Sequence, residues 1–179
     1  MKFVIASDLH GAAPAVRTLM ERIDQETPDR VLLLGDLLYH GPRNDLPEGY
    51  APKEVLATLN GIAERIVAVR GNCDAEVDQM MLEFPCMGDY ALVFADDMRL
   101  FCTHGHVFGS GLHNSVNNMP KLPKGSAFLF GHTHIKVNER DVHNSGVWLF
   151  NPGSVSIPKD GSHSFGIFDD KTFTHRILL

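Results

Sequence analysis

The sequence predicts an α/β fold in which parallel strands come first and antiparallel strands follow. Over residues 1–70, short apolar runs alternate with amphipathic helical patterns, which is typical of parallel strands joined by right-handed crossovers. After residue 90, short apolar runs are separated by tight turns, which favours antiparallel pairing. The chain of 179 residues is long enough for one domain with a substantial core, so we expect a single domain over 1–179.

The first half of the chain contains three apolar runs and three helical patterns. The runs predict buried strands over 2–7 (KFVIAS), 30–35 (RVLLLG) and 65–69 (RIVAV). Helices are expected from Pro14 onward, over 52–64 and over 75–82. The first two of these helices begin at a proline, which is favoured in the first helical turn.

The second half is expected to contain six short strands that pair antiparallel. These strands cover 90–96, 98–104, 126–131, 146–151, 165–169 and 173–179. Two long segments rich in glycine and proline, 37–52 and 108–126, separate the regular elements. Loops of this length are uncommon in compact domains and are often functional.

Composition restricts the partners and the cellular compartment. The formal net charge is −6, so the totals show no basic footprint for a long nucleic acid or an anionic membrane. A small phosphorylated ligand is still compatible, because a metal cluster can supply local positive charge. The three cysteines form no CxxC pair, and the N-terminus lacks a signal-peptide core. We therefore expect free thiols and a cytoplasmic location.

Polar side chains able to bind a metal follow five of the apolar runs. They are Asp8 with His10, Asp36, Asn72 with Asp74, His104 with His106, and His132 with His134. Residues two apart on an extended strand project to the same side, so each pair can reach one site. Ligands of α/β proteins bind at the carboxyl ends of strands, which is where these residues are expected to lie.

Each motif has a structural alternative when it is taken alone. Asp8 can cap the following helix, Asp36 can occupy a turn, and Asn72 can form an Asx turn. Two His-x-His pairs that each follow an apolar run are not explained by core packing, so the five motifs together favour a metal site. Three histidines in polar surroundings are instead expected at exposed positions: His143, His163 and His175.

The set of oxygen and nitrogen ligands is too large for one tetrahedral zinc ion, and thiolate pairs for a structural zinc site are absent. A mixed set of about seven ligands suits two divalent ions a few ångströms apart, the arrangement used for in-line displacement at phosphorus. Asp36 lies in the chain between the Asp8/His10 pair and Asn72, so it is the expected bridging carboxylate.

The ordered pattern D-x-H, G-D, G-N-x-D, H-G-H and G-H-x-H resembles the calcineurin-like metallophosphoesterase superfamily. More narrowly, the segments HGPRNDLPEGYAP and NPGSVSIPK are similar to those of small bacterial phosphodiesterases of the YfcE type. The resemblance covers nearly the whole chain. It implies a four-layer α/β/β/α sandwich with mixed sheets and a dimetal site above the sheet edges.

The resemblance also implies roles for individual residues. One metal would be held by Asp8, His10 and His134 and the other by Asn72, His104 and His132, with Asp36 bridging the two. Manganese is the first choice for both divalent ions, with zinc, iron(II) and nickel as alternatives. A metal-bridging hydroxide would attack the phosphorus of a small phosphodiester, because two cations lower the pKa of bound water. The residues expected to act in catalysis are Asp36, Asn72, Asp74 and His106.

Position 73 departs from the family pattern. Many members have a histidine there that protonates the leaving group, but this chain has Cys73. A thiol is a weaker hydrogen-bond donor, so Cys73 is interpreted as a small residue that lines the substrate site. The missing donor favours phosphodiesters with acidic leaving groups over alkyl phosphomonoesters. Asp74 then lacks its usual partner, and its role stays open.

Three further residues are candidates to contact the substrate. His106 can contact phosphate or assist the leaving group, and the alternative is that it supports the metal ligands. Arg43 and Asn44, on the segment 37–52, are candidates to bind phosphate. The alternative for Arg43 is an ordinary solvated loop residue.

A rival interpretation is a catalytically weak scaffold or protein-binding module. The retromer scaffold subunit shares the fold implied by the resemblance, but it has asparagine for the bridging aspartate and aspartate for the ligating asparagine. This chain keeps Asp36 and Asn72, so we favour an enzyme. The expected partner is a small phosphodiester, with no long nucleic acid and no membrane, and the exposed loops could also build a homo-oligomer.

Overall fold

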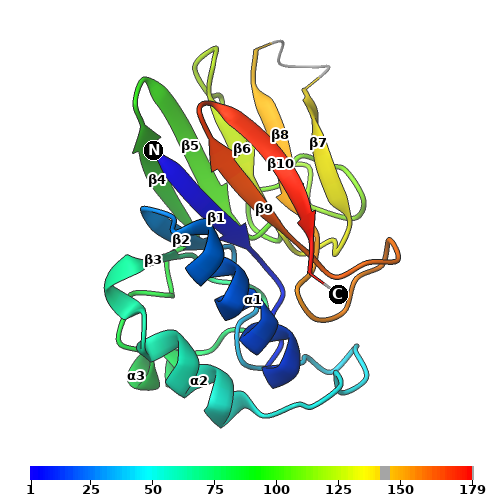
Figure 1. The fold of residues 1–179 in the computed structure, drawn as a ribbon. Coiled ribbons are helices and arrows are strands. Elements are labelled where there is room, and N and C mark those ends of the chain that lie inside the picture. Colours follow the sequence, from blue (N-terminus) through cyan, green and yellow to red (C-terminus); the bar gives the residue numbers. More distant parts are fainter. Residues whose placement is uncertain (142–145, 179) are drawn as a thin grey trace.

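Two five-stranded sheets stack face to face, and the helices lie on the outer side of the first sheet (Figure 1). The computed structural model describes residues 1–141 and 146–178. The first sheet has the strand order β10-β9-β1-β2-β3. Its strands are β1 (Lys2–Ala6), β2 (Arg30–Leu33), β3 (Ile66–Ala68), β9 (Ser164–Asp169) and β10 (Thr172–Ile177).

Parallel pairing at the start of the chain is confirmed. β1 pairs parallel with β2, and β2 pairs parallel with β3. The connections contain α1 (Ala13–Glu26) and α2 (Pro52–Asn60), each with a proline in its first turn. α2 ends earlier than predicted, and a 3₁₀ turn over Ala63–Arg65 leads into β3. The short helix α3 (Glu76–Met81) is tied to α2, because Asn60 Nδ2 donates to the carbonyl of Met81.

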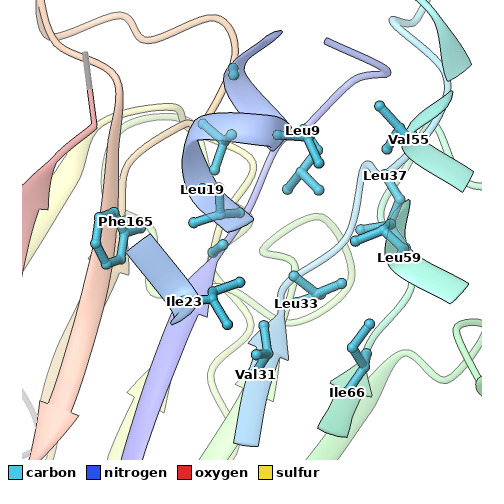
Figure 2. Packing of buried hydrophobic residues seen from close by; sticks show 14 of the residues in the cluster. Leu9, Leu19, Ile23, Val31, Leu33, Leu37, Val55, Leu59, Ile66 and Phe165 are labelled. Atoms are coloured by element: carbon cyan, nitrogen blue, oxygen red, sulfur yellow. The ribbon is translucent and has the colours of Figure 1, made fainter. Parts of the chain in front are cut away.

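The outer face of the first sheet packs against α1 and α2. Leu19 and Ile23 of α1 and Leu59 of α2 gather around Val31 and Leu33 of β2 (Figure 2). These side chains are almost completely buried. Truncating one such leucine to alanine costs about 2–5 kcal/mol of stability. This layer therefore holds in place the strands whose ends carry the predicted ligands.

The second sheet has the strand order β4-β5-β6-β8-β7. Its strands are β4 (Tyr90–Ala95), β5 (Met98–Thr103), β6 (Ala127–Leu129), β7 (Lys136–Arg140) and β8 (Trp148–Pro152). Antiparallel pairing is confirmed for β4 with β5, for β7 with β8 and for β9 with β10. It is wrong for β6, which pairs parallel with both β5 and β8.

Strand β7 is absent from the elements predicted by the sequence. It lies at the edge of the second sheet, and Val137 is its one buried side chain. An edge strand of this kind lacks the apolar run that marks the other strands. Because β7 takes the edge, β8 returns alongside β6 in the parallel direction, and the carboxyl ends of β5 and β6 lie at the same edge of the sheet.

Apolar side chains fill the space on both faces of the second sheet. Ile5 of β1 and Phe150 of β8 belong to the cluster between the two sheets. On the outer face, Phe128 of β6 belongs to a separate cluster, against which Phe108 and Leu112 pack. The fourth layer is therefore built by the segment 104–126, in which the structure assigns no helix. The α/β class with two mixed sheets is confirmed.

Two of the histidines expected at exposed positions are half-buried instead. Nδ1 of His163 donates to the Val155 carbonyl at 2.8 Å. Nε2 of His175 donates to the Asn151 carbonyl at 2.8 Å, and its ring stacks on Phe150. The expectation is wrong at both positions because each ring finds a carbonyl acceptor inside the fold. His143 lies outside the described residues.

The three cysteines agree with the expectation of free thiols. Cys73, Cys86 and Cys102 are free thiols, and the last two are buried. Within residues 1–141 and 146–178, each helix is too short or too polar to cross a membrane.

Candidate metal centre

The predicted ligands lie just beyond the ends of five strands. Asp8 and His10 follow β1, Asp36 follows β2, Asn72 follows β3, His104 follows β5, and His132 and His134 follow β6. Five of them have φ between 44° and 68°: Asp8, His10, Asp36, His132 and His134. This left-handed region costs a non-glycine residue about 1–3 kcal/mol, and residues held there cluster at functional sites as well as in turns. The backbone bends sharply at these points, and the side chains meet.

Asp8 lies at the centre of the cluster, and its side chain is fully buried. Its Oδ1 is 3.2 Å from Nε2 of His134 and 3.8 Å from Nε2 of His10. Its Oδ2 accepts the backbone N–H of His132 at 3.1 Å. Oδ1 has no hydrogen-bond partner within the described part of the chain. A buried carboxylate oxygen without a partner is costly, and a bound cation would remove that cost.

Asp36 contacts histidines from both predicted metal sites. Its Oδ2 is 3.4 Å from Nε2 of His104 and 3.6 Å from Nε2 of His10. Its Oδ1 accepts the backbone N–H of Cys73 at 2.7 Å. Gly71 approaches so closely that a Cβ there would overlap the Asp36 carboxylate. The ends of β2 and β3 are therefore packed too tightly for any other residue at position 71.

The remaining predicted ligands lie beside His104. Oδ1 of Asn72 is 3.2 Å from Nε2 of His104. The ring centroid of His132 is 5.1 Å from that of His104. Asn72 is exposed and His132 is half-buried, whereas His104 is fully buried. This half of the cluster is thus open to incoming molecules.

Three of the histidines present the same ring nitrogen to the cluster. Nδ1 of His10 lies 2.8 Å from the Tyr39 carbonyl, Nδ1 of His104 lies 2.6 Å from the Leu34 carbonyl, and Nδ1 of His134 lies 2.7 Å from the Ile157 carbonyl. A carbonyl only accepts, so each Nδ1 carries the hydrogen. In the neutral ring, Nε2 is then a free lone pair that points into the cluster. Metal-binding histidines are oriented in this way in proteins.

The charges in the cluster act strongly on one another. Burial alone would raise the pKa values of Asp8 and Asp36, but His134 acting on Asp8 and His104 acting on Asp36 lower both. Burial alone would lower the pKa of His104, but Asp36 and Asp8 raise it to about 9. In the metal-free protein, a protonated His104 therefore supplies the positive charge that two buried carboxylates require.

The donor set and its spacing fit divalent cations. Ligating atoms lie within 4.8 Å of one another in three groups: Asp8, His10 and His134; Asp8, Asp36 and His104; and His10, Asp36 and Cys73. Carboxylate oxygens and imidazole nitrogens are suitable ligands for manganese, iron, nickel and zinc. Together with the unpaired Oδ1 of Asp8, this arrangement supports a site for divalent metal ions.

The carboxylate of Asp74 is bound to the backbone of the site, although the residue also forms part of the lining of the cavity over the cluster. Its carboxylate accepts the N–H of Asp36 at 2.8 Å, of Leu37 at 2.8 Å and of Gly71 at 2.7 Å. The residue is almost completely buried. The sequence leaves the role of Asp74 open. Its contacts in the structure are structural, because they join the ends of β2 and β3.

Cys73 and His106 lie at the border of the cluster. Nδ2 of Asn72 donates to Sγ of Cys73 at 3.2 Å. The ring of His106 lies 5.3 Å from His104 and 6.3 Å from His132, measured between centroids. Nδ1 of His106 is buried without a hydrogen-bond partner among the described residues.

A cavity of about 750 Å³ opens over the cluster, and Asp36, Asn72 and His132 form part of its lining. Arg43 and Asn44, the two candidates to bind phosphate, line the same cavity. Asn44 is held by a hydrogen bond from its Nδ2 to the His40 carbonyl at 2.8 Å. The segment 37–52 thus carries both residues to the candidate metal centre.

The cavity is also lined by residues that sequence reasoning missed: Tyr39, His113, Asn114 and Lys159. His113 and Asn114 have φ of 48° and 72°, so their backbone is left-handed like that of the ligands. The available signals were the unusual length of the segment 108–126 and the motif NPGSVSIPK, which ends at Lys159.

Two serines of the same motif support the cluster. The backbone carbonyl of Asp8 accepts the hydroxyl of Ser154 at 3.0 Å and that of Ser156 at 2.7 Å. The motif thereby fixes the backbone of a ligand from the far end of the chain.

Comparison with known proteins agrees with this geometry. Residues 1–172 match the calcineurin-like phosphoesterase superfamily domain. The chain belongs to this superfamily. Phosphodiesterase YfcE of Escherichia coli (strain K12) is 46% identical over 171 residues, which cover 95% of this chain and 88% of that protein. A phosphodiesterase of Methanocaldococcus jannaschii is 27% identical over 186 residues and covers 100% of this chain and 99% of its own length.

The solved structure of Escherichia coli YfcE has the same fold. It matches with a TM-score of 0.88 and 41% identity, and the match covers 100% of both chains. The resemblance stated from the sequence is therefore confirmed. The expected class of metal-dependent phosphoric diester hydrolase agrees with the superfamily and with the names of both relatives.

Proposed function

We propose that this chain is a phosphodiesterase that hydrolyses small phosphodiesters with two divalent metal ions. The observation that carries the proposal is the inward orientation of three imidazoles around two buried carboxylates. The Nδ1 atoms of His10, His104 and His134 donate to carbonyls, and their Nε2 atoms face Asp8 and Asp36. Core packing alone would not place this many unpaired ligand atoms together.

The ions would be shared between two sets of residues. Asp8, His10 and His134 would hold one ion; Asn72, His104 and His132 would hold the other; Asp36 would bridge them. Manganese is our first choice, with zinc, iron(II) and nickel as alternatives. When bound, the ions supply a hydroxide nucleophile near neutral pH and neutralise charge on the phosphoryl oxygens.

Cationic and polar side chains around the cavity would bind the phosphate. Arg43 can donate two parallel hydrogen bonds to phosphate oxygens, and Asn44 and His113 can add further donors. Lys159 brings a second positive charge to the lining. These groups make the mouth of the cavity attractive to an anion, although the chain as a whole carries a net charge of −6.

Among the residues that the structure describes, the site lacks a strong general acid to protonate the leaving group. Burial, and then the negative charge of Asp36, raise the pKa of Cys73, so its thiol stays neutral and is a poor proton donor. Burial, and then the positive charge of His104, lower the pKa of His106 to about 4. At pH 7 a neutral His106 would contact phosphate as a hydrogen-bond group. The site therefore suits diesters whose leaving groups depart without a proton.

The rival proposal is a catalytically weak scaffold or protein-binding module. A protein-binding module would not need ligand atoms aligned toward a cation, and the retained Asp36 and Asn72 argue for catalysis. A cytoplasmic location and a homo-oligomer stay predictions.

Hydrolysis of bis(p-nitrophenyl) phosphate by manganese-loaded protein tests the proposal. Asp36→Asn and Asn72→Ala should each abolish the manganese-dependent rate, because each removes a metal ligand. The exposed Asp169→Asn is the matched control and should retain full activity. Full activity in either ligand variant would overturn the assignment, and no activity with any of the four metals would favour the scaffold. Chelation followed by add-back of single metals identifies the ion.

A further inference from the structure

A second hollow of about 410 Å³ opens beside the metal cavity. Its walls come from the segment after β2 and from α2 and α3, which lie next to each other (Figure 1). Tyr39, Cys73 and Ala75 line both this hollow and the metal cavity. The two spaces are therefore contiguous, and we call the second one the apolar groove.

The lining of the apolar groove offers few charged groups to a polar ligand. Only Lys53 and Asp78, among the eleven lining residues, carry a charge. The Asp78 carboxylate is already used, because its Oδ2 accepts the N–H of Ala75 at 2.8 Å. The other lining residues include Leu38, Leu56 and Met81, which offer hydrocarbon and thioether surface.

Apolar side chains around the groove are left in contact with water. Val77 is 59% exposed and Met81 is 55% exposed, both on α3. Tyr39 is 41% exposed. Covering such surface is favourable by about 25 cal/mol per Å², so a ligand that fills the groove gains affinity from it. A groove of this size falls within the range of small-molecule sites.

The position of the groove relative to the metal cluster is fixed by Tyr39 and Cys73. The carbonyl of Tyr39 accepts Nδ1–H of His10, so the residue shared by both spaces also orients a metal ligand. A Cβ at Gly41 would come within 2.7 Å of Sγ of Cys73. Gly41 therefore packs closely against Cys73, which lines both spaces.

We propose that the apolar groove is the subsite for an aromatic or heteroaromatic substituent of the phosphodiester substrate. The inference rests on the proposed function, because it requires the phosphorus to sit over the metal cluster. A flat ring suits a lining that includes the rings of Tyr39 and Tyr50 and the thioether of Met81. The groove would then select aryl or nucleoside esters over small alkyl esters.

Calorimetric titration of the manganese-loaded protein with phosphonates tests this subsite without any reaction. Phenylphosphonate and methylphosphonate carry the same anionic group and one substituent each. We expect phenylphosphonate to bind at least about tenfold more tightly in the wild-type protein. Cyclohexylphosphonate has similar bulk but no π face, and it should bind more weakly than phenylphosphonate. If cyclohexylphosphonate bound as tightly as phenylphosphonate or more tightly, the aromatic assignment would be overturned.

Two variants on the same helix separate the groove from general effects of charge. Met81→Glu places a carboxylate in the lining and should bring the phenyl-to-methyl ratio close to one. Met80→Glu is the matched control, since Met80 is 80% exposed and does not line the groove. It should keep the wild-type ratio. An unchanged ratio in Met81→Glu would overturn the subsite.

The same measurements distinguish the inference from the proposed function. Equal affinity for phenylphosphonate and methylphosphonate, with intact hydrolysis of bis(p-nitrophenyl) phosphate, would overturn the subsite and leave the phosphodiesterase standing. Absence of both phosphonate binding and diester hydrolysis would overturn both.

Discussion

The carboxylate of Asp74 accepts the backbone N–H of Asp36 at 2.8 Å, across the gap between the ends of β2 and β3. The same carboxylate accepts the N–H groups of Leu37 and Gly71. Asp36 in turn accepts the N–H of Cys73, so the two loops hold each other in both directions. The expected bridging ligand is therefore positioned by a second aspartate, whose carboxylate is taken up by three backbone N–H groups.

Asp74→Asn should lower both stability and activity. The side-chain NH₂ of the new asparagine would replace one carboxylate oxygen and would face a backbone N–H that needs an acceptor. The lost hydrogen bonds should lower the free energy of unfolding by about 1–3 kcal/mol. Displacement of Asp36 should lower kcat at least about tenfold and weaken manganese binding. Urea unfolding, steady-state kinetics and metal titration measure these effects.

Asp89→Asn is the matched control for this variant. Asp89 accepts hydrogen bonds from Arg70 near the surface, and such pairs are worth about 0–1 kcal/mol. Equal losses in both variants, or wild-type manganese affinity in Asp74→Asn, would contradict the positioning role of Asp74.

Metal loading should stabilise the fold. Dialysis against a chelator leaves Asp8 and Asp36 as buried carboxylates beside a protonated His104. Manganese at about 100 times its Kd should then add about 2.7 kcal/mol, which corresponds to a rise in Tm of about 5–10 °C. Differential scanning calorimetry with and without manganese measures the shift. Asp36→Asn should show a much smaller rise, and a Tm independent of manganese in the wild-type protein would argue against the site.

The sequence predicts that these side chains gather at one place, because the candidate ligands follow apolar runs. Asp8, Asp36 and His104 each come directly after a strand that is buried in the core, and such runs are readable without a structure. When five strand ends carry such residue types, few folds would keep these side chains apart. The left-handed backbone at Asp8 and Asp36 could not be foreseen, because nothing in their local sequence requires it.

Polar edges and long loops escape prediction for a physical reason. In β7 only Val137 is buried, so the strand resembles a loop in composition. Without β7, the sequence gives no indication that β6 and β8 pair in parallel. His113 and Lys159 reach the metal cavity from segments without periodicity. Their placement depends on tertiary contacts, such as the hydrogen bond from the N–H of Lys159 to the His134 carbonyl.

Stability should fall in mild acid through His175. Burial lowers the pKa of His175, and its Nε2–H donates to the Asn151 carbonyl. The folded state thus binds a proton less readily than the unfolded chain, whose histidine pKa is about 6.5. The contribution is fully present above that value and is lost as pH falls toward the lower folded-state pKa.

Urea unfolding between pH 5 and 8 can isolate this contribution. His175→Gln keeps an N–H donor but removes the titration, so its stability should depend less steeply on pH below about 6.5. His113→Gln, at an exposed position, controls for the removal of one imidazole. A wild-type slope in His175→Gln would place the acid sensitivity elsewhere in the chain.

Cys73→His should shift the enzyme toward phosphomonoesters and poor leaving groups. The wild-type thiol has a raised pKa and is a weak donor, whereas an imidazole can act as a general acid worth about 10²–10⁴-fold. The benefit is largest where the leaving group needs a proton. The ratio of kcat/KM for an alkyl phosphomonoester to that for bis(p-nitrophenyl) phosphate should therefore rise at least about tenfold.

The larger ring must fit beside Gly41, where even an added Cβ would lie 2.7 Å from the thiol sulfur of Cys73. Cys73→Ser supplies the matched control, because it keeps the small size and adds no general acid. It should leave the monoester-to-diester ratio unchanged. A rise in the ratio with serine would mean that loss of the thiol, and not gain of a general acid, governs substrate choice at this position. An unchanged ratio with histidine would mean that another group already supplies the proton. If the ratio is unchanged with histidine, the double variant Cys73→His with His106→Gln tests whether His106 is that other group. His106 is the neighbouring imidazole that could donate a proton, so its removal should then let the ratio respond.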